Sequence, residues 1–156
     1  MEYFRSHVLV CGGTGCTSSG SETLLKLLDE KLLEHGLDKE IKAIRTGCFG
    51  LCEAGPVVIV YPEGTFYSRV APRDIEEIVT EHLLKGRVVK RLLHHDKQAE
   101  TAVDLSLDEM PFYKHQTRIA LRNCGVIAPE NIDEYLAFDG YKALEKCLLH
   151  ATPEDV

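Results

Sequence analysis

Short apolar runs bounded by glycine or proline divide the first half of the chain and indicate β-strands. The runs span residues 7–10, 41–45, 57–61 and 65–70. Between the first two runs, leucines recur at helical spacing, which predicts a helix over residues 20–36 with a capping box formed by Ser19 and Glu22. The same spacing predicts a second helix over residues 72–86, with a proline in its first turn. Strands and helices therefore alternate.

The order of these elements predicts a compact α/β domain that covers residues 1–86. The run over residues 57–61 is apolar throughout, which is typical of a strand buried on both faces. A Pro-Glu-Gly turn joins it to the next strand, so we expect these two strands to form a hairpin.

The second half of the chain has a different character. Residues 87–110 turn polar and lose a clear period, so we predict a linker there. Residues 111–156 predict a short helical segment, with helices over residues 113–123, from residue 129 and over residues 141–149. The last residues resemble the start of a further helix, and we therefore expect the chain to be a fragment.

Composition and charge exclude several classes of function. The 156 residues carry a net charge of −7, which argues against sequence-independent binding to nucleic acid or to an anionic membrane. Charges interrupt every apolar run, so no segment is expected to insert into a membrane, and the first residues do not resemble a signal peptide. We expect a cytoplasmic protein.

Four of the six cysteines form two close pairs, Cys11-x4-Cys16 and Cys48-x3-Cys52. Each pair lies in a glycine-containing loop that follows a predicted strand, so the loops can converge if the two strands are neighbours. Four thiolates complete the coordination of two irons bridged by two sulfides. Amides of the first loop could donate hydrogen bonds to sulfur. The spacing favours a [2Fe-2S] cluster.

Two other interpretations of the four cysteines stay open from spacing alone. Structural zinc also takes four cysteines from short loops, which would make the chain a zinc-stapled module that docks subunits without redox activity. A thiol–disulfide oxidoreductase is a further alternative, although the usual Cys-x-x-Cys motif is absent.

Two motifs carry a family resemblance: Cys-Gly-Gly-Thr-Gly-Cys, followed by a leucine-rich helix, and Cys-Phe-Gly-Leu-Cys-Glu-Ala-Gly-Pro-Val-Val. Residues 1–86 thereby resemble the thioredoxin-like [2Fe-2S] ferredoxins. All four ligand positions of that family are filled, and the resemblance implies one-electron transfer through a cluster with these ligands: Cys11, Cys16, Cys48 and Cys52.

Three stretches after residue 111 extend the resemblance: Phe-Tyr-Lys-His-Gln, Arg-Ile-Ala-Leu-Arg-Asn-Cys-Gly and Ile-Asp-Glu-Tyr. They resemble the opening of the NADH-binding flavoprotein subunit of respiratory complex I and of soluble NAD(P)-linked hydrogenases, some of them electron-bifurcating. The resemblance implies a parent NAD(P)H-dependent oxidoreductase with other redox subunits as partners, including a ferredoxin or a hydrogenase subunit. Its FMN and NAD(P)H sites would lie outside this chain, and we expect the chain to have no catalytic site of its own.

The remaining candidate residues have simpler explanations. We expect Cys124 and Cys147 to be buried structural thiols, and His94 and His95 to be solvated in the linker. Glu53 is expected to be an exposed acid beside Cys52, where its charge could tune the cluster.

Overall fold

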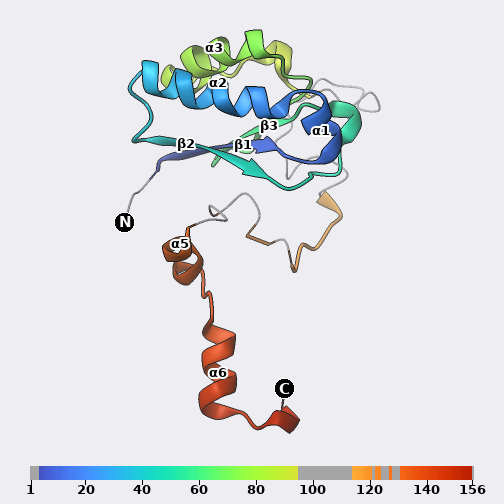
Figure 1. Cartoon of the computed structure of the whole chain (residues 1–156), viewed down its shortest axis with the longest axis vertical. Coiled ribbons are helices and arrows are strands. Elements are labelled where there is room, and N and C mark those ends of the chain that lie inside the picture. Colours follow the sequence, from blue (N-terminus) through green and yellow to red (C-terminus); the bar gives the residue numbers. More distant parts are fainter. Residues whose placement is uncertain (1–3, 95–113, 121, 124–126, 128–130, 156) are drawn as a thin grey trace.

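The computed structural model describes residues 4–94, 114–120, 122–123, 127 and 131–155 (Figure 1). A four-stranded sheet has the order β2-β1-β3-β4. The strands are β1 (Ser6–Cys11), β2 (Ile41–Thr46), β3 (Val58–Tyr61) and β4 (Thr65–Tyr67). β1 and β2 are parallel, whereas β3 is antiparallel to both of its neighbours. The α/β class and the β3–β4 hairpin are therefore confirmed.

The last strand is shorter than the sequence predicts. β4 ends at Tyr67 because Arg69 has a φ of 53°, a left-handed conformation that extended backbone does not adopt. The amide of Ser68 faces the outer edge of the sheet and donates to the carbonyl of Leu92 at 2.9 Å. The amides of Arg69 and Val70 still donate to the carbonyls of Ala54 and Pro56, so the regular pairing ends while the two segments stay adjacent.

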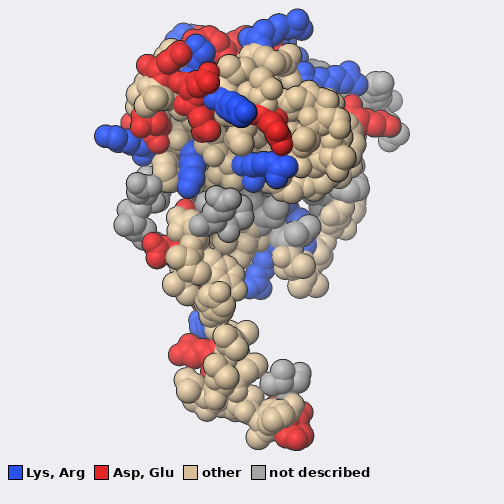
Figure 2. Space-filling view, viewed as in Figure 1, with Lys and Arg blue, Asp and Glu red and all other residues tan. Residues whose placement is uncertain are grey.

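Helices cover one face of the sheet (Figure 1). α1 (Thr14–Ser18) is a single turn, and α2 (Ser21–Glu34) is the long helix that the leucine spacing predicts. The second predicted helix is also present, built from a 3₁₀ turn, α3 and a π-helical turn over Pro72–Asp74, Ile75–Glu77 and Ile78–Leu84. Basic and acidic side chains lie side by side over this layer, as in the 3.1 Å ion pair between Lys31 and Glu76 (Figure 2).

The predicted capping box at the start of α2 is wrong. The residue before the helix is Gly20, whose φ of 92° is left-handed, and no side chain caps the helix. Ser19 instead donates its hydroxyl to the carbonyl of Gly15 at 2.9 Å, which ties it to α1. A glycine in this position reverses the chain between two helices that follow one another directly.

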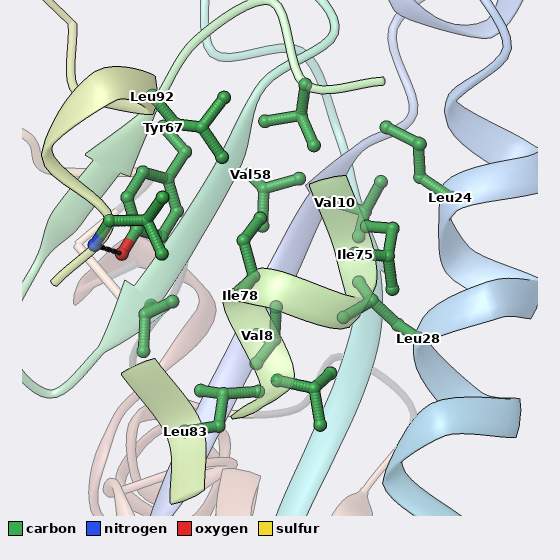
Figure 3. Close-up of a cluster of buried hydrophobic side chains, with 14 of the residues drawn as sticks. Val8, Val10, Leu24, Leu28, Val58, Tyr67, Ile75, Ile78, Leu83 and Leu92 are labelled. Atoms are coloured by element: carbon green, nitrogen blue, oxygen red, sulfur yellow. Dashed lines mark hydrogen bonds between the residues drawn. The ribbon is translucent and has the colours of Figure 1, made fainter. Parts of the chain in front are cut away.

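The main core lies between the sheet and this helical layer. Val8, Val10 and Val58 point from the strands towards the helical layer (Figure 3). Leu28 of α2 and Ile78 of the π-helical turn pack against them with no measurable exposure to solvent (Figure 3). The opposite face of the sheet carries a second apolar cluster. One row crosses all four strands in register there and includes Ile44, Leu9, Ile59 and Phe66.

Residues 87–94 pack against the domain, within the segment that the sequence predicts to be a linker. Val89, Leu92 and Leu93 are buried in the main core, and a 3₁₀ turn spans Lys90–Leu92. Leu93 forms a β-bridge with Tyr67. The segment therefore lies along the free edge of β4.

The described C-terminal residues form α5 (Ile132–Ala137), α6 (Lys142–His150) and a 3₁₀ turn (Pro153–Asp155), as the expected helical segment requires. A helix through residues 113–123 is not observed, since residues 116–118 are not helical. Most of this stretch is exposed, so little packing stabilises a helix in water. Among the described residues, no helix has the length and apolar character needed to cross a bilayer.

Candidate metal centre

The parallel pairing of β1 and β2 brings the two cysteine loops to the same end of the sheet. Cys11 is the last residue of β1 and lies opposite Thr46, the last residue of β2. The first loop leads through α1, which holds Cys16. The second loop begins after Thr46, and Cys52 starts a 3₁₀ turn at its far side. The expected convergence of the loops is confirmed.

The four thiols lie in two pairs that differ in exposure. Cys11 and Cys16 are each only 2% exposed and belong to the second apolar cluster. Cys48 and Cys52 are exposed, and their sulfurs are 3.9 Å apart. The amide of Gly50 donates to the sulfur of Cys48 at 3.3 Å. One pair is therefore shielded by the core, whereas the other faces solvent.

The pKa values show that the thiols influence one another. Burial, followed by the hydrogen bond with Cys11 and the nearby Cys52, raises the pKa of Cys16 to about 11. The hydrogen bond with Cys48 is the main cause that raises the pKa of Cys52, and Cys11 adds to it. Without metal, Cys16 and Cys52 therefore hold their protons more firmly than isolated thiols do, and a metal ion that binds them as thiolates must displace these protons.

Glycines allow the loops to approach the sulfurs closely. A β-carbon on Gly13 would lie 3.0 Å from the sulfur of Cys48, and one on Gly55 would lie 2.8 Å from the sulfur of Cys16. A β-carbon on Gly15 would reach within 3.9 Å of the sulfur of Cys52. Backbone thus lies close to the sulfurs of Cys16, Cys48 and Cys52.

The grouping of the sulfurs fits two metal ions better than one. The thiols form the Cys11–Cys16 and Cys48–Cys52 pairs. A [2Fe-2S] cluster takes four cysteines for two irons, whereas structural zinc takes four ligands around one ion. The donor set therefore fits the cluster.

The sequence pattern of the thioredoxin-like [2Fe-2S] ferredoxins matches residues 3–83. The chain belongs to this family. The wild-type thioredoxin-like [2Fe-2S] ferredoxin of Aquifex aeolicus has a similar crystal structure, with a TM-score of 0.54 and 35% identity over 60% of this chain and 99% of that one. The thioredoxin-like fold and the [2Fe-2S] cofactor are therefore confirmed, and with them electron transfer of the ferredoxin type.

Three further relatives differ in how much of the chain they match. A 2Fe-2S ferredoxin of Clostridium pasteurianum is 40% identical over 96 residues, which are 56% of this chain and 94% of that protein. A putative 2Fe-2S ferredoxin of Priestia megaterium is 31% identical over 139 residues, or 89% of this chain and 90% of that protein. The NADP-reducing hydrogenase subunit HndC of Solidesulfovibrio fructosivorans is 56% identical over 43 residues, which are 28% of this chain and 9% of that protein.

The other candidate residues lie away from this centre or differ from expectation. Cys147 on α6 is half-buried, so the expectation of a buried thiol is wrong. His94 is not simply solvated, because its ring packs on Phe66 with centroids 5.3 Å apart. Glu53 is exposed as expected. Cys124 and His95 lie outside the described residues.

Arg45 is a residue near the centre that the sequence did not indicate. Its guanidinium donates to the carbonyl oxygen of Gly12 at 3.2 Å, although the two residues are 33 positions apart. The alternation of β2 marks Arg45 only as an exposed charge. Its contact with the first cysteine loop depends on the parallel register of β1 and β2.

Proposed function

We propose that Cys11, Cys16, Cys48 and Cys52 are the four ligands of the [2Fe-2S] cluster and that the domain passes single electrons through it. The observation that carries the proposal is the convergence of two pairs of thiols at one end of the sheet. When bound, the cluster supplies a group that gains and loses one electron. Fixed thiolates on short loops limit the rearrangement that each transfer requires.

The two pairs of cysteines have different tasks in this proposal. Cys11 and Cys16, buried in the apolar cluster, exclude water from the inner side of the centre. Cys48 and Cys52 are exposed, so a redox partner can approach the centre from their side. We therefore assign the entry and exit of electrons to the loop that contains Cys48 and Cys52.

The wider setting that we propose is a cytoplasmic NAD(P)H-linked flavoprotein oxidoreductase or hydrogenase. Residues 1–86 form the ferredoxin domain in this proposal, residues 87–110 connect it, and residues 111–156 begin a flavoprotein domain. The partial similarity to the hydrogenase subunit HndC supports this setting. FMN and NAD(P)H would bind to parts of the parent protein outside this chain, and other redox subunits would be the partners.

A second candidate is a ferredoxin that exchanges electrons with separate partners and needs no flavoprotein domain. The similarity to the Priestia protein over 89% of this chain favours it. Anaerobic purification of the native protein from its source separates the two candidates. Flavin that co-purifies, with an iron–sulfur signal that NADH or NADPH reduces, supports the flavoprotein; a flavin-free protein that neither nucleotide reduces supports the separate ferredoxin.

The ligand assignment is tested by visible absorption and electron paramagnetic resonance of the anaerobic protein, before and after dithionite. We expect broad visible bands that bleach on reduction, and a loss or change of the spectrum when each of the four cysteines is replaced by serine. Cys147→Ser is the matched control and is expected to leave the spectrum unchanged. A colourless protein that binds zinc after attempted cluster reconstitution would contradict the proposal in favour of a zinc-stapled module.

A further inference from the structure

The peptide group of Gly12 is held from several sides. Its N–H donates to the carbonyl of Thr46 at 3.0 Å. Its carbonyl oxygen accepts from the guanidinium of Arg45 at 3.2 Å and from the hydroxyl of Thr17 at 3.3 Å. Gly12 follows Cys11 directly, so these contacts fix the backbone at the point where the first cysteine loop leaves β1.

Arg45 packs closely against the backbone at Gly12. A β-carbon on Gly12 would lie 2.6 Å from the carbonyl oxygen of Thr46 and 2.9 Å from the guanidinium carbon of Arg45. A larger residue would have to shift the Thr46 backbone as well as the flexible end of Arg45. The guanidinium therefore lies against the residue next to Cys11.

The charge of Arg45 has no acidic partner in the part of the chain that the structure describes. Within the described residues no carboxylate pairs with it, whereas Arg5, Arg87 and Arg91 each pair with a glutamate. A positive charge close to a redox centre favours the form with the additional electron, because that form carries one more negative charge. Since Arg45 is exposed, water screens part of this effect.

We propose that Arg45 is a positioning residue for the iron–sulfur centre: it holds the Cys11 loop through the Gly12 carbonyl, and its charge favours uptake of the electron. The proposal rests on the proposed ligation by Cys11. Arg45 does not contact the electron donor or acceptor in this role. Holding the loop slows loss of the cluster, and the charge raises the reduction potential, so the two effects can be measured separately.

The test compares three variants of the full chain: Arg45→Gln, Arg45→Lys and Lys42→Gln. Lys42 lies on the same strand, three residues or about 10 Å from Arg45, with its ammonium over the ring of Phe4. Lys42→Gln therefore removes the same charge without touching the cysteine loop. The readouts are the midpoint potential from a mediated dithionite titration and the rate at which a chelator bleaches the visible spectrum.

For Arg45→Gln we expect the redox equilibrium to shift at least threefold towards the oxidised form, or about 28 mV at 59 mV per tenfold. Bleaching should be at least threefold faster. Arg45→Lys keeps the charge, so its midpoint potential should lie close to that of the wild type. Lys42→Gln should match the wild type in both midpoint potential and bleaching rate. Equal behaviour of Arg45→Gln and Lys42→Gln would overturn the inference, and a potential in Arg45→Lys as low as in Arg45→Gln would overturn the role of the charge.

The outcome for Cys11→Ser distinguishes this inference from the proposed ligand set. If Cys11→Ser alters the spectrum but Arg45→Gln matches the wild type, only the inference about Arg45 fails. If Cys11→Ser keeps the native spectrum, the ligation by Cys11 fails, and the inference fails with it.

Discussion

Gly55 offers a direct steric test of the cluster site, because a methyl group there would point at the sulfur of Cys16. The added β-carbon would lie 2.8 Å from this sulfur, at least about 0.7 Å inside the ~3.5–4.0 Å of an ordinary contact. The φ of −71° and ψ of 158° at Gly55 suit alanine, so backbone strain does not contribute. Most of the effect of Gly55→Ala should therefore fall on Cys16, and a smaller part on the carbonyl oxygen of Cys52, which would lie 3.3 Å from the added carbon.

The energetic cost of Gly55→Ala depends on how tightly Cys16 is packed. Cys16 is 2% exposed and packed among apolar side chains, so its sulfur has little room to retreat. Overpacking at such a position costs about 1–3 kcal/mol. If this cost weakens cluster binding, retention should fall roughly 5- to 150-fold, since each 1.4 kcal/mol corresponds to a factor of ten.

The assay is the rate of bleaching under a chelator, together with the iron and sulfide content of the purified protein. Gly47→Ala is the matched control, because Gly47 precedes Cys48 directly and a β-carbon there would meet nothing within 4 Å. Unfolding of the metal-free variants in urea shows whether the fold itself is affected. Equal cluster retention in Gly55→Ala and Gly47→Ala would refute the reasoning.

Two predictions concern the buried pair of Tyr67 and His82. The hydroxyl of Tyr67 accepts from the amide of Val89 at 3.0 Å and lies 2.8 Å from Nδ1 of His82, so Tyr67→Phe should lower the free energy of unfolding by about 1–3 kcal/mol in urea titrations. Burial lowers the pKa of His82 below its ordinary 6.5, so the folded state keeps it neutral. The stability that this neutral His82 gives the fold is fully present above pH 6.5. It is lost as the pH falls below 6.5, by up to about 1.4 kcal/mol per pH unit. His82→Gln should reduce the slope of stability against pH between 6.5 and 5, and an unchanged slope would contradict this assignment.

The sequence was sufficient for most of the domain because its elements follow local patterns. The leucines of α2 keep helical spacing over 14 residues, and the short β-branched run of β3, bounded by proline on both sides, is typical of a buried strand. The two cysteine pairs were found in the same way, from their spacing. The start of α2 was not predicted correctly, because the hydroxyl of Ser19 donates to the carbonyl of Gly15 and does not cap the helix that follows.

The details of the site arise from contacts between residues that are distant in sequence. Gly55 faces Cys16 only because the second loop folds over the first, and Arg45 reaches Gly12 only through the register of β1 and β2. No local pattern encodes these neighbours. The sequence thus indicated which cysteines belong together, but not which glycines and which arginine shape their surroundings.

Residues 87–94 stabilise the fold through contacts that the sequence did not indicate either. Charged residues interrupt the apolar ones there, so the stretch has no clear period, yet Leu92 is 6% exposed in the main core and Arg91 pairs with Asp74 at 2.9 Å. We predict that Leu92→Ala lowers the free energy of unfolding by about 2–5 kcal/mol, as other buried leucines do. Val88 lies in the same segment but is 37% exposed, so it provides the control. Val88→Ala should change the free energy of unfolding by less than about 0.5 kcal/mol. Equal effects of the two variants would mean that the segment does not contribute to the core, because the two side chains differ by one carbon in size but strongly in burial.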